Sequence, residues 1–167
     1  MRALGIDLGS KRIGVALSDS AGTLAVPYEV VHRSGQWEQD HRAIAALAEE
    51  AEVEVVVVGL PFSLDGSLGR AARRTLLEVR KLEAALPVPV ETYDERLSTV
   101  TAHRSLDEMN MGGGARRRVV DKVAAAVILQ AWLDRRAEQR STIADPNPVA
   151  PIADGEPPAR TNPSESP

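Results

Sequence analysis

The run Val53-Glu54-Val55-Val56-Val57-Val58 constrains the fold of this chain more than any other stretch of the sequence. Successive side chains of a strand point to opposite faces, so this β-branched run is apolar on both faces. Such a strand is typical of the centre of a parallel sheet, where both faces are covered by helices. The run therefore predicts an α/β domain.

The start of the chain predicts a β-hairpin that turns at Gly9-Ser10-Lys11. If the two strands pair, Asp7 lies among Gly5, Gly14 and Ala16. These small neighbours leave room either for a ligand to reach the carboxylate or for a helix to pack closely. The simpler alternative is that Asp7 only begins the turn, since Asp-x-Gly is common in turns.

The remaining elements follow from apolar periodicity. A third extended run contains Pro27, which cannot donate to a sheet ladder and so favours an edge position. Strands are expected over residues 24–33, 53–58 and 88–93, and helices over 36–52, 70–85, 98–108 and 115–139. This order predicts a mixed five-stranded sheet, with three antiparallel strands first and with the first, fourth and fifth strands parallel.

Seven of the 11 prolines fall in residues 141–167, where no apolar periodicity remains. We expect residues 1–140 to form one domain and residues 141–167 a disordered, proline-rich tail. The tail carries four acids and one arginine, so the net charge of −4 leaves only −1 for the domain. Nucleic acid would therefore have to bind at local basic clusters rather than over a generally basic surface.

The composition also excludes several kinds of site and location. There is no cysteine, so no disulfide framework or thiolate metal site can form. Without a charged leader or a long apolar segment, we expect a cytoplasmic protein that does not enter the membrane. The three histidines lack the spacing of metal ligands.

Ligands of open α/β sheets bind beyond the carboxyl ends of the parallel strands. Those ends carry Asp7, the turn Gly59-Leu60-Pro61, and the polar run Asp94-Glu95-Arg96. A third acid, Asp121, shares a helical stripe with Ala124, Ala125, Ile128 and Trp132, which should face the sheet.

Asp7, Glu95 and Asp121 are thus expected at one edge of the sheet. Carboxylates that lie so near one another recruit cations, and oxygen-only ligands favour Mg²⁺ or Mn²⁺. Two such ions would support in-line attack on a phosphodiester. The alternative for Asp121 is an early-turn acid favoured by the helix dipole, or one paired with Arg117 or Arg118.

Basic and loop residues near these acids are candidates for substrate contacts. A loop over residues 63–69 is expected to close over a substrate, whereas Arg96 is expected to be a structural ion-pair partner. For the arginines of the second helix, a solvated helix face is an equally good interpretation. The candidate phosphate contacts are Lys11, Arg12, Arg70, Arg73, Arg74, Arg116 and Arg117, and the loop positions are Gly59, Pro61, Gly66 and Gly69.

Four motifs, in order, carry a specific family resemblance: Ala3-Leu4-Gly5-Ile6-Asp7-Leu8-Gly9 with Arg12-Ile13-Gly14-Val15-Ala16; Gly59-Leu60-Pro61 with Asp65-Gly66; Asp94-Glu95-Arg96-Leu97-Ser98-Thr99; and Asp121-Lys122-Val123-Ala124-Ala125. Over residues 2–136 the chain resembles the YqgF/RuvX family of pre-16S rRNA nucleases, relatives of RuvC-type Holliday junction resolvases. The resemblance implies an RNase H-like fold and a divalent-metal nuclease with Asp7, Glu95 and Asp121 as catalytic acids. Asp7 would bridge two ions.

The resemblance leaves the substrate open between precursor rRNA, with possible ribosomal assembly partners, and branched DNA, with a possible homodimer. Junction resolvases generally carry a fourth acid where Ala124 stands, which argues against junction cleavage. A non-catalytic module that docks on nucleic acid or a ribosomal partner is a further alternative. The glycine motif around Asp7 also resembles that of actin-like ATPases, but those proteins need a second domain.

Overall fold

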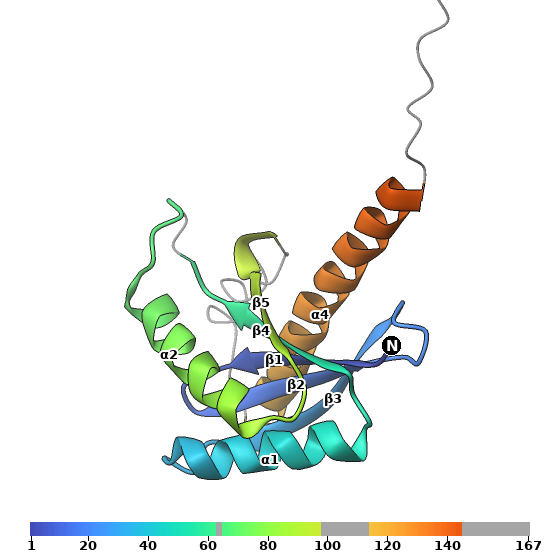
Figure 1. Ribbon diagram of the computed structural model, residues 1–167. Helices are drawn as coiled ribbons and strands as arrows, with labels where there is room; N and C mark the ends of the chain where they lie inside the picture. Colours follow the sequence, from blue (N-terminus) through green and yellow to red (C-terminus); the bar gives the residue numbers. More distant parts are fainter. Residues whose placement is uncertain (63–64, 98–113, 145–167) are drawn as a thin grey trace, which may run out of the picture.

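The computed structural model describes residues 1–62, 65–97 and 114–144 (Figure 1). The predicted helix over 98–108 lies outside these residues, as do residues 145–167. The elements are β1 (Ala3–Leu8), β2 (Arg12–Ser18), β3 (Ala25–His32), α1 (Trp37–Glu50), β4 (Val55–Leu60), α2 (Arg70–Ala85), β5 (Val90–Asp94), the 3₁₀ turn η1 (Glu95–Leu97) and α4 (Gly114–Ala144).

The five strands form one mixed sheet in the order β3-β2-β1-β4-β5. The strands β1, β2 and β3 pair antiparallel, whereas β1 pairs parallel with β4 and β4 with β5. This confirms the predicted sheet and the edge position of the strand that contains Pro27. The register places Asp7 opposite Gly14, as the hairpin pattern predicted.

The central strand β4 is buried along its whole length, but it lies two residues further along the chain than predicted. Val53 is buried in the connection from α1, where its N–H donates to the Ala48 carbonyl. Gly59 and Leu60 instead belong to β4 and pair with β5. The apolar pattern reported burial correctly, but burial does not distinguish a strand from the connection that leads into it.

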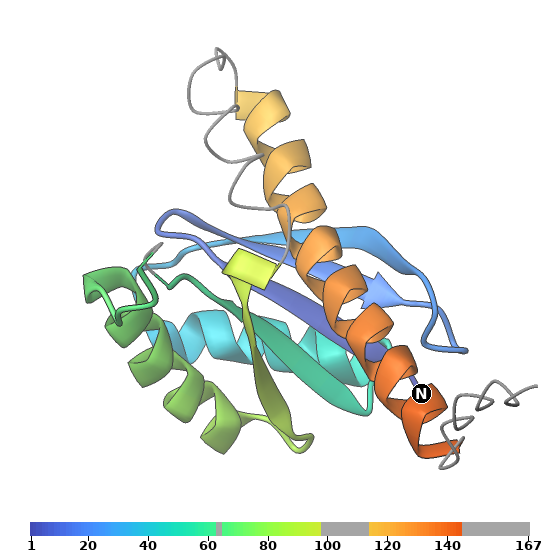
Figure 2. The same ribbon diagram turned by 90° about the horizontal axis from the view of Figure 1, so that it is seen from above.

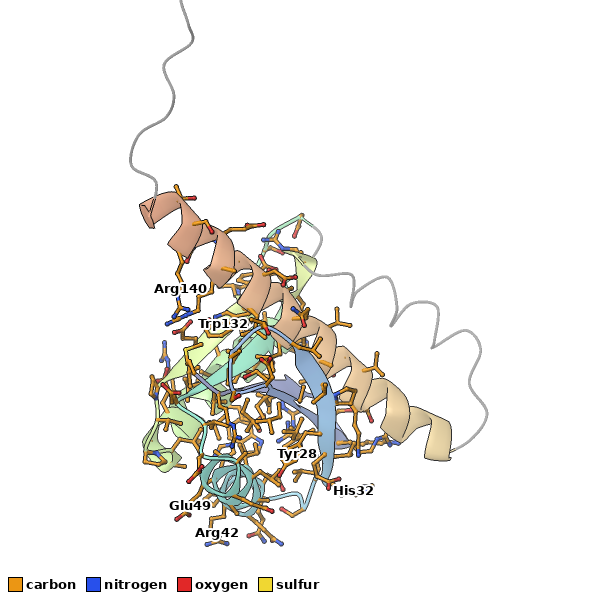
Figure 3. The ribbon with its side chains drawn as sticks, turned by 90° about the vertical axis from the view of Figure 1, so that its right-hand side faces the viewer. Tyr28, His32, Arg42, Glu49, Trp132 and Arg140 are labelled. Atoms are coloured by element: carbon orange, nitrogen blue, oxygen red, sulfur yellow. The ribbon has the colours of Figure 1, made fainter. Side chains whose placement is uncertain are left out.

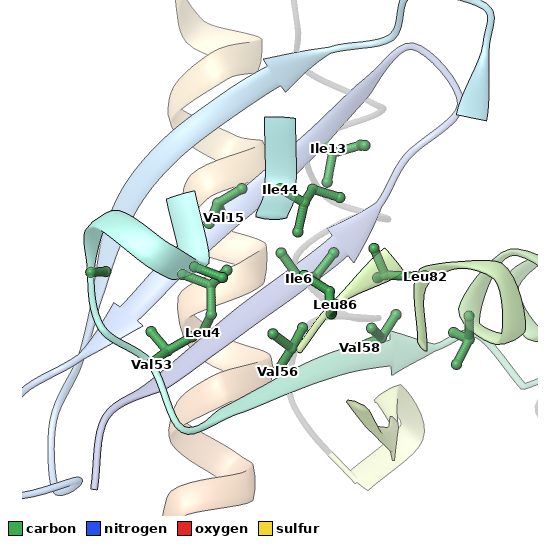
Figure 4. Packing of buried hydrophobic residues seen from close by; sticks show 13 residues of the cluster. Leu4, Ile6, Ile13, Val15, Ile44, Val53, Val56, Val58, Leu82 and Leu86 are labelled. Carbon is green, nitrogen blue, oxygen red and sulfur yellow. The ribbon is translucent and has the colours of Figure 1, made fainter. Parts of the chain in front are cut away.

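One face of the sheet is covered by α1 and α2 and the other by α4 (Figures 1 and 2). Every second residue of the inner strands contributes to the larger core, which lies between the sheet and the helices α1 and α2 (Figure 4). Its fully buried members from the sheet and helices are Leu4, Ile6, Ile13, Val15, Ile44, Val56, Val58 and Leu82.

The second core lies under α4, where the predicted stripe packs against Ala3, Ala16 and Val57 of the sheet. Trp132 is buried on the side of α4 that faces the sheet, as predicted (Figure 3). The helix continues to Ala144 rather than ending near residue 139, so the first four residues of the predicted tail are helical. Among the described residues, no helix is long and apolar enough to cross a membrane.

Candidate active site

Asp7 lies near the carboxyl end of β1, on the face of the sheet that α4 covers. Its exposed fraction is only 5%. The chain turns immediately after it, because the Gly9 N–H donates to the Asp7 carbonyl at 3.0 Å. A Cβ on Gly9 would lie 2.4 Å from the Arg12 carbonyl oxygen, so only glycine fits this turn. The tight turn therefore fixes the backbone position of Asp7.

Asp121 is placed over the same point of the sheet by the close approach of α4. A Cβ on Gly14 would lie 2.0 Å from the Asp121 carbonyl oxygen, so the helix backbone rests directly on the Gly14 position. Gly14 is also the register partner of Asp7. One glycine therefore brings the backbones of both acids together, and the helix rather than an open space explains the small residues around Asp7.

Glu95 follows β5 in the 3₁₀ turn and is 4% exposed. Its Oε1 would lie 2.6 Å from a Cβ on Gly59, on the same side of the sheet as α4. Gly59 follows Val58, the register partner of Ile6, just as Asp7 follows Ile6. Asp7 and Glu95 are thus at neighbouring strand ends on one face.

The carboxylate of Asp121 is held by Arg12, whose Nε lies 2.5 Å from Oδ2. The two side chains are 21% and 24% exposed, so solvent screens the pair and its contribution to stability is modest. Arg12, a predicted phosphate contact, is therefore an ion-pair partner of a predicted catalytic acid. The side chains of Arg117 and Arg118, the alternative partners, lie outside the described part.

The three carboxylates suit a hard divalent cation in kind, because Mg²⁺ and Mn²⁺ prefer oxygen ligands. As they stand, the described acids and histidines include no group of three close enough to hold an ion. In the structure, one carboxylate oxygen of Asp121 is instead paired with the Arg12 guanidinium. Their chemistry and backbone positions fit a metal that would replace Arg12 at Asp121.

The loop after β4 is attached to Arg96. The Nη2 of Arg96 lies 2.5 Å from Asp94 Oδ2, and the Arg96 guanidinium lies 5.1 Å from the centre of the Phe62 ring, in the loop. The hydrogen bonds from Arg96 hold the pKa of Asp94 below its ordinary value, against a smaller effect of burial. Gly66, with φ of +83°, lets the loop pass close to Arg96. The structural role predicted for Arg96 is confirmed.

Among the predicted basic candidates, Lys11 follows the carboxyl end of β1, and the arginines at the start of α2 follow β4 along the chain. Lys11 is exposed in the hairpin turn, and α2 begins at Arg70 directly after Gly69. Arg116 and Arg117 belong to the first turn of α4, but their side chains lie outside the described part. Pro61 is half-buried just beyond β4. The exposed arginines at the start of α2 are Arg70, Arg73 and Arg74.

A buried ionic cluster beside the hairpin turn was missed from the sequence. It consists of Arg33 after β3, Asp40 of α1 and Glu78 of α2. A usable signal exists, because Asp40 lies four residues before Ile44 and Glu78 four residues before Leu82, on the buried stripes of their helices. A charged residue on such a stripe indicates a partner elsewhere in the core.

A cavity of about 270 Å³ lies away from the acids, between β5 and the second half of α4. Trp132 donates from Nε1 to Glu91 at 2.9 Å there, and Arg136 lies over the Trp132 ring. These contacts tie α4 to the edge strand. The residues that line this cavity therefore have a structural role. The candidate site is the one formed by the three acids.

A mixed sheet in the order β3-β2-β1-β4-β5, with helices on both faces (Figure 1), defines an RNase H-like fold. The chain is similar to RuvC of Thermus thermophilus in complex with a Holliday junction substrate, with a TM-score of 0.53 and 19% identity over 83% of this chain and 96% of that one. At this identity the likeness shows the fold.

Sequence comparison gives the family. The profile described as "RuvX: Holliday junction resolvase" matches residues 1–135. A protein of Desulforamulus reducens named "Putative pre-16S rRNA nuclease" is 41% identical over 83% of this chain and its own whole length. One of the same name from Rhodococcus opacus is 47% identical over 81% of this chain and 79% of its own length. This chain belongs to the RuvX family, and is thus a hydrolase of phosphodiester bonds.

Proposed function

We propose that this protein is a divalent-metal-dependent endonuclease that processes the 5′ end of precursor 16S rRNA. The observation that carries the proposal is the placement of Asp7, Glu95 and Asp121 on one face at one end of the sheet. The shared name of relatives more than 40% identical favours precursor rRNA as the substrate. Location in the cytoplasm and ribosomal assembly partners remain predictions of the same account.

Each residue has a proposed task in phosphodiester hydrolysis. Asp7, Glu95 and Asp121 would hold Mg²⁺ or Mn²⁺, which supplies an activated water and stabilises the leaving oxygen. Arg12, released from Asp121, would be free to bind a substrate phosphate, as guanidinium groups do bidentately. Lys11 and the exposed arginines of α2 would contact neighbouring phosphates along the backbone.

Holliday junction cleavage is the second candidate, because the family profile carries that description. At the position of the resolvases' fourth acid, Ala124 is buried against the sheet under α4. The chain thus offers one carboxylate fewer at this point, which favours the rRNA substrate.

The test compares cleavage of a precursor 16S rRNA leader and of a four-way DNA junction, with Mg²⁺ or Mn²⁺, by the wild type and Asp7→Asn. Glu138→Gln, an exposed acid near the far end of α4, is the matched control. RNA cleavage that Asp7→Asn abolishes and Glu138→Gln retains supports the proposal. Junction cleavage alone transfers the assignment to DNA, and binding without cleavage of either substrate identifies a docking module.

A further inference from the structure

The buried ionic cluster of Arg33, Asp40 and Glu78 joins the connection after β3 to the helices α1 and α2, beside the hairpin turn. The side chains of Asp40 and Glu78 are 1% and 2% exposed, and that of Arg33 is 11% exposed. Both terminal nitrogens of Arg33 donate to Glu78: Nη1 donates to Oε1, and Nη2 donates to Oε2 at 3.1 Å. Its Nη1 also lies 3.3 Å from Asp40 Oδ2. The guanidinium is held from two helices at once.

Arg33 keeps its positive charge in the core. Burial alone would lower the pKa of Arg33, but the hydrogen bonds and charge of Glu78, followed by those of Asp40, raise it above its ordinary value. Asp40 is fixed in turn by the Ser34 N–H, which donates to Oδ1 at 2.9 Å. Apolar residues often replace buried ion pairs without loss of stability, so stability alone does not explain this cluster.

Arg33 uses two further donors on the hairpin turn. Its side-chain Nε donates to the Gly9 carbonyl at 3.0 Å, and its backbone N–H donates to the Lys11 carbonyl at 3.0 Å. One residue therefore holds a carbonyl at each end of the turn. The position of Arg33 is itself set by the fork on Glu78, because a bidentate pair fixes both distance and orientation.

We propose that Arg33 is a positioning residue of the acid site, with Glu78 and Asp40 as its supports. Gly9 also donates to the Asp7 carbonyl, and Lys11 precedes Arg12, the partner of Asp121. Movement of this turn would displace Asp7 and Arg12 together. The consequence for metal binding rests on the proposed nuclease function, whereas the consequence for the turn does not.

The principal test is Arg33→Lys in the full chain. Lysine keeps a positive charge for Glu78 and Asp40, but it lacks the planar fork and the Nε donor. We expect hydrogen exchange at the Gly9 amide to accelerate about tenfold and Mn²⁺ affinity to fall about tenfold, as for other supports of metal ligands. Glu78→Gln, which removes a support and keeps Nε, should shift both readouts in the same direction by less.

Ile44→Val is the matched control, because it removes one methylene from the same core and makes none of the contacts with the turn. It should lower the unfolding midpoint while Gly9 exchange and Mn²⁺ affinity stay at wild-type values. The proposal is overturned if Arg33→Lys and Ile44→Val change both readouts equally, or if Arg33→Lys and Glu78→Gln change neither.

Failure of the proposed function would look different. A wild type that binds Mn²⁺ but cleaves no nucleic acid contradicts the nuclease proposal, while the Arg33 variants still decide the positioning role without substrate. If the wild type does not bind Mn²⁺, hydrogen exchange at the Gly9 amide alone decides the positioning role of Arg33. Faster exchange in Arg33→Lys and Glu78→Gln, but not in Ile44→Val, is the supporting result.

Discussion

Gly5 and Gly14 determine how closely α4 can approach the sheet. A Cβ on Gly5 would lie 2.7 Å from the Leu129 Cβ, and one on Gly14 would lie 2.0 Å from the Asp121 carbonyl oxygen. Neither atom is the free end of a flexible side chain, so the helix backbone would have to move. The distance between the acids is therefore set partly by residues that have no side chain.

Gly14→Ala is predicted to destabilise the fold by about 3 kcal/mol, at the upper end for overpacked sites, and Gly5→Ala by less. The order follows from the two distances, since the Gly14 overlap is with backbone. Denaturant unfolding of both variants measures the difference. Equal stability of Gly14→Ala and the wild type would show that α4 does not rest on this strand.

Asp40 makes the free energy of unfolding depend on pH in the acid range. Burial raises its pKa, but the hydrogen bonds of Ser34 and then the contact with Arg33 outweigh burial, so the pKa lies below its ordinary value of 3.8. A carboxylate with a depressed folded-state pKa stabilises the fold above its unfolded pKa, and this contribution is lost as the pH falls through the folded value.

Asp40→Asn should therefore flatten the decline of unfolding free energy between about pH 4 and lower pH, while costing stability at neutral pH. Urea unfolding of the wild type and Asp40→Asn across this pH range tests this prediction. Glu83→Gln, which replaces an exposed acid, is the control. Parallel pH profiles for the wild type and Asp40→Asn would contradict the assignment.

Residue partners were harder to predict than residue positions. Alternation along β1 placed Asp7 correctly because it depends only on strand geometry. The contact between Arg12 and Asp121 crosses 109 positions of sequence, and local pattern contains nothing that selects Arg12. Arg33 was missed for the same reason, since its partners are brought to it only when α1 and α2 pack on the sheet.

The position of α4 depends on an apolar stripe and on polar contacts with β3 and the connection that precedes it. Gln130 accepts from the Ala25 N–H at 2.8 Å and donates to the Thr23 carbonyl at 3.0 Å. Lys122 donates to the Tyr28 carbonyl at 3.3 Å. The stripe was predictable from the 3.6-residue period, but these contacts depend on the register between the helix and the edge strand.

Leu129→Ala is predicted to cost about 2–5 kcal/mol, because Leu129 is fully buried against the Gly5 position. Val123→Ala, on the same helix but 42% exposed, should cost less than about 0.5 kcal/mol. The comparison by denaturant unfolding keeps the helix constant and contrasts a buried with an exposed apolar side chain. Similar losses for the two variants would contradict the packing of α4 described above.

At the scale of the whole molecule, the strand order and the two covered faces were predictable from the β-branched run and the alternating hairpin. The exact ends of β4 and α4 were not, since burial and helix propensity continue past the strand and helix boundaries. The proline-rich tail remains a prediction from composition.

Removal of residues 145–167 is expected to leave the thermal unfolding midpoint unchanged, because this proline-rich stretch has no apolar periodicity with which to pack on the domain. Calorimetry of the full and shortened chains measures it. A lower midpoint for the shortened chain would mean that the tail packs on the domain.

The proposed function requires that Asp7, Glu95 and Asp121 form one divalent-metal centre. This requirement is tested by titration with Mn²⁺, followed by electron paramagnetic resonance, of the wild type, Asp7→Asn, Glu95→Gln and Asp121→Asn, with Glu138→Gln as control. We predict that each of the three substitutions weakens binding by at least about tenfold and that the control does not. Wild-type affinity in all three variants would contradict the claim.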